Sequence, residues 1–134
     1  MPRFYESNLR GDPMTPQDRE ERRLAAKAAG FKVKRDRDMD TDFLMDGDRV
    51  VAIDGQWSPK TDKADSFDLC CAISKHRNET PKAFDELPEN EQNAWIEITN
   101  GFTTGDASRC CKAIFNCAVE IGRSMEASNE RIGG

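Results

Sequence analysis

The sequence predicts an α/β (α+β) fold, in which three to four short strands form a small antiparallel sheet flanked by helices in α/β/α layering. Three observations predict it. A helix with complete start and stop signals spans residues 15–30, and an alternating segment with a hairpin signal spans 31–59. Helical patterns then continue to residue 125. Helices on both sides of the sheet are the arrangement that two apolar sheet faces demand.

The first helix is marked by local signals in "TPQDREERRLAAKAAG". Thr15 suits the N-cap, Pro16 suits the first helical position, and Gly30 suits the C-terminal stop. Its apolar side consists of Leu24 and three alanines, which allows a close approach to another element.

The strands are predicted from alternation and from one turn signal. "FKVKR" (31–35) has the period of a half-buried strand, and "DFLMDGDRVVAID" (42–54) contains the hairpin signal Asp-Gly. With Asp46 and Gly47 as the loop, Phe43 pairs with Val50. "QWSP" (56–59) is expected to form a short last strand.

The next helix is expected in "TDKADSFDLCCAISKH" (61–76), with Asp62 as its cap. Its apolar and small residues cover an arc of about 220°, whereas a surface helix usually buries about 100°. We therefore expect this helix to be covered on more than one side.

Two more helices complete the domain. One is expected from Pro88 to Thr99, ending at Gly101, and the other runs over 106–125 with Thr103 and Asp106 as a capping pair. The last helix is the clearest amphipathic one, since its apolar residues fall within an arc of about 120°.

Length and composition indicate one domain. Residues 15–125 of the 134 form the predicted domain, and 1–14 and 126–134 are expected to be flexible tails. No apolar run approaches the ~18 residues of a membrane span. The start "MPRFYESNLRGDPM" holds no apolar stretch of the kind found in secretory signals, so we expect a cytoplasmic protein.

The five cysteines show no spacing that is typical of zinc or redox sites. They stand at positions 70, 71, 110, 111 and 117. Adjacent helical residues point about 100° apart, so neither pair can chelate one ion with both thiols. We expect buried thiols that act as small hydrophobic side chains.

Two stretches together resemble a known signature. "WSPKTDKADSFDLCCAISKH" (57–76) and "DASRCCKAIFNCAVEIGRSM" (106–125) are similar to small tailed-phage proteins of the phage α/β/α (ABA) sandwich type. The similarity covers about 40 of the 134 residues. The doubled cysteines depart from the pattern. The matching positions are Trp57, Pro59, Asp62, Phe67, Arg109, Ala113, Ile114, Ile121, Gly122 and Arg123. The resemblance implies a phage or prophage origin and a layered fold, and it implies no activity.

The most unusual segment is "RDRDMDTDFLMDGDR" (35–49), which carries six acidic side chains. They are Asp36, Asp38, Asp40, Asp42, Asp46 and Asp48. An EF-hand loop needs glycine at its sixth position and glutamate at its twelfth. A loop starting at Asp36 places Thr41 and Gly47 there, so the pattern fails.

A looser Mg²⁺ or Ca²⁺ contact by two or three of these aspartates stays open, and so do three other interpretations of the segment. If residues 36–42 are extended, four carboxylates span about 20 Å, which is several times sparser than the charge of duplex DNA. Imitation of DNA would therefore need help from other acidic residues. Docking on a partner protein is the second interpretation, and a solvated strand and turn is the third.

The sequence offers little support for catalysis. His76 is the sole histidine and lies at the polar end of a helix, where it suits the helix dipole. No nucleophile elbow, P-loop or dinucleotide fingerprint occurs. A net charge of −5 argues against nucleic acid as the main partner. We therefore expect no catalysis, no cofactor and no metal.

The sequence thus predicts a small accessory binding protein, whose six acidic hairpin residues contact and modulate or inhibit a host or defence protein. The alternative is a binder of a phosphorylated small ligand or a divalent cation, with weak phosphoesterase activity as its enzymatic form. The oligomeric state is not predicted.

Overall fold

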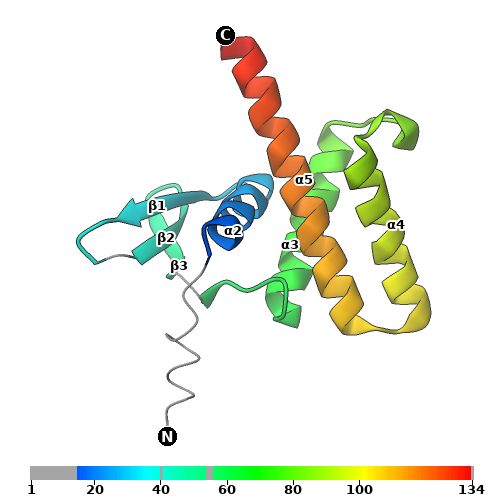
Figure 1. Ribbon diagram of the computed structural model, residues 1–134, viewed down its shortest axis with the longest axis horizontal. Coiled ribbons are helices and arrows are strands. Elements are labelled where there is room, and N and C mark those ends of the chain that lie inside the picture. The colour runs from blue at the N-terminus through cyan, green and yellow to red at the C-terminus, as the bar shows by residue number, and fades with distance from the viewer. Residues whose placement is uncertain (1–14, 40, 54–55, 134) are drawn as a thin grey trace, which may run out of the picture.

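The computed structural model describes residues 15–39, 41–53 and 56–133. Over these residues it has four α-helices, one 3-10 turn (η2) and a three-stranded antiparallel sheet, with helices packing on the sheet (Figure 1). The predicted α+β class is confirmed. The elements are α2 (Pro16–Ala28), β1 (Lys32–Asp36), β2 (Thr41–Asp46), β3 (Arg49–Ile53), α3 (Lys63–Glu79), η2 (Phe84–Glu86), α4 (Glu89–Thr104) and α5 (Ala107–Gly133).

Helix α2 begins as its sequence predicts. The Thr15 side chain accepts a hydrogen bond from the Asp18 backbone N–H at 3.0 Å. Gly30 follows the helix with a φ of 89°, a conformation that favours glycine. The small residues of α2 let α5 approach closely, because a Cβ added to Gly122 would lie 2.1 Å from the carbonyl oxygen of Leu24.

The sheet has the order β1-β2-β3, and its second hairpin differs from the predicted register. Asp46 pairs with Arg49, so the loop is Gly47 and Asp48 instead of Asp46 and Gly47. Gly47 takes a φ of 63° at the first loop position. The pairing also shifts between Leu44 and Met45, and such a bulge moves a side chain to the other face of a strand.

The inner face of the sheet packs on the helices. Val33, Leu44 and Ala52 stand opposite one another across the three strands, and Leu44 and Ala52 are buried. Helix α2 contacts β1 and also packs against α5, which contacts α3 and α4 in turn. Figure 1 accordingly shows the helices gathered on one side of the sheet, whereas the predicted α/β/α layering places helices on both sides.

Helix α3 is capped by Asp62, whose side chain accepts from the Asp65 N–H at 2.9 Å, as predicted. The buried face of α3 is narrower than expected, since its buried residues are Ser66, Leu69 and Ile73. Most of its wide apolar arc is therefore left without cover by the described residues, because one helix, α5, forms the main packing surface.

The last two helices are longer than predicted. Helix α4 passes through Gly101 and ends at Thr104, and the C-cap Gly105 adopts the left-handed conformation with a φ of 73°. Gly101 instead allows close packing, since an added Cβ would lie 2.6 Å from the Cys110 sulfur. Helix α5 continues to Gly133, beyond the predicted end at Met125. Asp106 caps it, whereas Thr103 belongs to α4.

Three expectations remain, namely a strand at 56–59, a flexible tail at 1–14 and the lack of a membrane span. Residues 56–59 form no strand, although Trp57 is buried and its ring meets Phe31 edge to face. The segment 1–14 lies outside the described residues. No helix within the described ranges combines the length and apolar character needed to cross a membrane.

The cysteines match their predicted role in part. All five are free, and Cys110, Cys111 and Cys117 are buried in the core. Cys70 is half-buried and Cys71 is exposed, because both lie on the uncovered part of the α3 arc.

Candidate functional site

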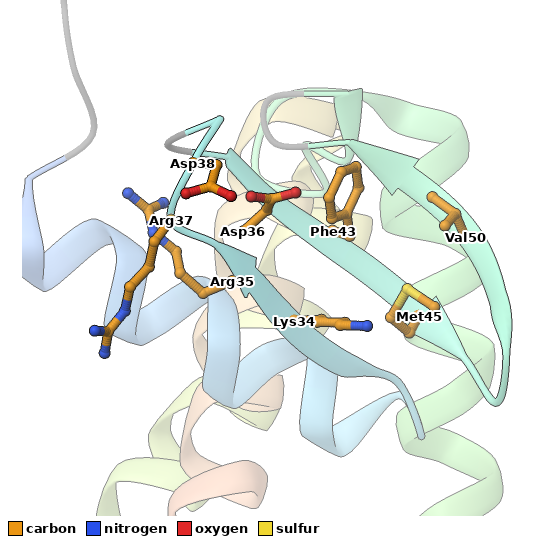
Figure 2. A pocket seen from close by; sticks show the side chains of 8 residues that line it. All are labelled: Lys34, Arg35, Asp36, Arg37, Asp38, Phe43, Met45 and Val50. Carbon is orange, nitrogen blue, oxygen red and sulfur yellow. The ribbon is translucent and has the colours of Figure 1, made fainter.

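The candidate site is the outer face of the sheet, which points away from α2. Lys34, Phe43 and Ile53 lie opposite one another on it, and Met45 pairs with Val50 beside them. Figure 2 shows the side chains of Lys34, Phe43, Met45 and Val50 on this face. They line a hollow of about 360 Å³, with Asp36 and Asp38 at the end formed by the β1–β2 turn.

The centre of this outer face is apolar and open. Val50 is 48% exposed and Ile53 is 42% exposed, while Phe43 and Met45 are half-buried. The sequence predicts apolar residues on both sheet faces, and helices cover the inner one. Among the described residues no helix covers the outer face, so an apolar surface faces solvent there.

Asp36 and Asp38 lie on the rim of the hollow. The Asp36 side chain accepts a hydrogen bond from the Met39 N–H at 3.2 Å, which stabilises a turn over 37–39. This turn reverses the chain, so that Asp36 pairs with Thr41. The alternating aspartates therefore do not form one extended strip, because the extended conformation considered for 36–42 is interrupted.

Asp42 lies on the inner face and is neutralised there. Its carboxylate forms ion pairs with Arg35 at 3.0 Å and with Arg19 of α2 at 3.4 Å. The Asp42 side chain is 13% exposed. It therefore ties the sheet to α2 and is poorly placed to contact a partner.

Asp46 and Asp48 lie at the other end of the sheet. β2 is six residues long, or about 17 Å at roughly 3.3 Å per residue, which separates them from Asp36 and Asp38. Asp46 forms an exposed ion pair with Arg49 at 3.4 Å. Asp48 is exposed in the hairpin loop, and Asp40 lies outside the described residues.

The sheet as a whole is nearly neutral. Between Lys32 and Ile53 the chain has five basic and six acidic residues. On the rim itself Lys34 and Arg37 accompany Asp36 and Asp38. The structure thus brings two of the predicted acidic residues together beside an apolar centre, within a surface of mixed charge.

Other polar clusters of the described chain serve the fold. Glu91 is fully buried and binds Arg77 and Trp95. Within α2, the arginines at 19 and 23 form ion pairs with Asp42, Glu20 and Glu126. Over the described ranges no three His, Cys, Asp or Glu side chains are grouped as ligands for a metal ion.

The outer-face residues could be found only partly from the sequence. Alternation places Phe43 and Met45 on one face of β2, and this signal is visible in the sequence. Hairpin pairing across the Asp-Gly signal also places Val50 on this face, but the contribution of Ile53 depends on the bulge, for which the sequence has no marker.

Comparisons with protein-family models, curated proteins and solved structures find no match to this chain. The resemblance to phage α/β/α-sandwich proteins therefore stays a prediction.

Proposed function

We propose that this chain is a non-catalytic binding protein, which takes up an apolar surface patch of another protein on the outer face of its sheet. The observation that carries the proposal is the group of Phe43, Met45, Val50 and Ile53, which form an apolar area without helix cover among the described residues. Apolar patches of this kind on a small protein usually mark contacts with other molecules.

The charged residues at the rim of the hollow support the proposal that its ligand is a protein. Protein interfaces combine an apolar centre with a polar rim, and this hollow has Lys34 and Arg37 of one sign and Asp36 and Asp38 of the other.

In this proposal the exposed acidic residues of the sheet determine which partner is bound. Asp38 and Asp48 are exposed at opposite ends of the sheet and form no ion pair with other described residues. Charged rim residues mainly select partners and speed association. The partner itself, as part of the same proposal, is a host or defence protein in the cytoplasm. That part has its support in the resemblance to phage proteins alone.

Site-specific photocrosslinking tests the proposal. A photoreactive phenylalanine analogue is placed at Val50 in one variant and at Ile96 in the control. Ile96 lies on α4 and is also 48% exposed, so the two positions are matched in accessibility. After irradiation in bacterial cells, position 50 should give one specific adduct, and position 96 should give none.

The adduct counts as support only after the captured protein is purified and its affinity is measured. We expect Val50→Ser to weaken binding at least tenfold and Ile96→Ser to leave it unchanged. Asp38→Asn should slow association and reduce its dependence on salt. An adduct between two copies of this chain, or equal effects of both serine variants, would contradict the proposal.

A further inference from the structure

A second apolar hollow lies on the opposite part of the molecule, between α3 and α4. Both helices pack on α5, whose first turns form the floor (Figure 1). The groove has a volume of about 420 Å³, which falls in the usual range of roughly 300–1,000 Å³ for small-molecule sites. It is distinct from the sheet face in the proposed function.

The groove is bounded by two prominent aromatic rings. Phe67 of α3 is 67% exposed and Phe102 of α4 is 65% exposed. Ile114 and Cys110 of α5 line the groove between them. This is the part of the wide α3 arc that has no cover from the described residues.

One buried hydroxyl in this groove has no partner. Ser66 is 2% exposed, and its Oγ forms no hydrogen bond. It is the single buried side-chain polar atom of the described residues in this condition. A buried hydroxyl without a partner is unfavourable, so a ligand atom that accepts its hydrogen would be stabilised.

Lys63 lies one turn before Ser66 on α3 and also lines the groove. Residues three apart lie on the same side of a helix, so both polar groups can reach one ligand head group. Lys63 forms no ion pair with the described residues. The nearby carboxylates of Asp62 and Asp65 are already engaged as acceptors of the Asp65 and Ser58 N–H groups.

We propose that this groove binds an amphipathic carboxylate with an unbranched apolar chain. The carboxylate accepts hydrogen bonds from the Lys63 ammonium and the Ser66 hydroxyl, and the chain lies between Phe67 and Phe102. The Ser66 hydroxyl is buried in the free protein, so binding requires neighbouring side chains to move, and the exposed Lys63 and Phe67 beside it are free to change rotamer.

Calorimetric titration of the whole chain with decanoate tests this site. Decanoate should bind saturably, decanol more weakly, and decyltrimethylammonium weakest of the three, because Lys63 repels a cation. Ser66→Ala and Lys63→Met should each weaken decanoate binding about tenfold. Lys75→Met, an exposed change on the same helix, should leave the affinity unchanged.

A melting curve shows whether a variant loses affinity for decanoate because the site has changed or because the protein is misfolded. Without decanoate, Ser66→Ala should melt no lower than the unchanged protein, because alanine has no hydroxyl to satisfy. Three results would overturn the proposal: no saturable binding, equal affinity for decanol, or wild-type affinity in both variants. Loss of self-association in Phe67→Ser, measured by sedimentation, would overturn it as well and would identify a second copy of this chain as the occupant.

Discussion

Replacing Glu91 with alanine tests whether one buried ion pair holds α3 and α4 together. Glu91 Oε1 accepts from Arg77 Nη2 at 2.7 Å, and Oε2 accepts from Arg77 Nε at 2.7 Å and Trp95 Nε1 at 3.0 Å. The Glu91 side chain is fully buried, and the Arg77 side chain is 17% exposed. The alanine variant leaves the Arg77 guanidinium largely buried without its counter-charge.

The expected loss is large for a protein of this size. Removing one partner of a buried ion pair costs about 3–5 kcal/mol, since the remaining charge stays desolvated. For a domain of this length, 1 kcal/mol shifts Tm by about 4 °C. We therefore expect the Tm of Glu91→Ala to fall by about 12–20 °C.

Thermal unfolding followed by tryptophan fluorescence and circular dichroism measures this loss. Glu97→Ala is the matched control, since Glu97 also lies on α4 and pairs with an arginine, Arg109, but both side chains are more than a third exposed. That variant should unfold almost like the unchanged protein. The double variant Arg77→Met/Glu91→Leu should lose less than the sum of its single changes. Equal losses in Glu91→Ala and Glu97→Ala would refute the reasoning.

Three further predictions concern packing, thiol reactivity and pH. Gly122→Ala should lose about 1–3 kcal/mol in thermal unfolding, because its Cβ would overlap the Leu24 carbonyl. In a thiol-reagent assay of the folded protein, exposed Cys71 should react first and Cys117 last, because burial raises the pKa of the Cys117 thiol. Burial lowers the pKa of His76 below its usual 6.5, so the unfolded chain binds that proton more readily. Stability should therefore fall as the pH drops below 6.5, and His76→Gln should reduce this dependence in pH-dependent melts.

Helix starts were predictable because their causes are local. Thr15, Asp62 and Asp106 each accept a backbone hydrogen bond from a residue three positions later, and the sequence pattern contains both partners. Helix ends were less predictable. Gly101 resembles a stop signal, yet it lies inside α4 because its missing side chain lets α4 approach Cys110.

The acidic segment shows the same limit for the candidate site. Its six aspartates are obvious in the sequence, but their positions depend on a turn after Asp36 and on the pairing of Asp42 with two arginines. The partner Arg19 is more than twenty positions away from Asp42, so no local pattern could indicate that contact. The apolar groove between α3 and α4 could not be predicted for the same reason, since its lining residues come from α3, α4 and α5, which are far apart in the sequence.

The sequence by itself determined where the helices begin, that two or more strands alternate, and that both sheet faces carry apolar residues, because propensity, capping and alternation act between near neighbours. Tertiary structure alone decided which apolar faces are covered. A single helix, α5, packs against α2, α3 and α4, so the outer face of the sheet and one side of α3 have no cover within the described chain. Burial depends on which distant segments meet, and those two uncovered surfaces are where binding is proposed.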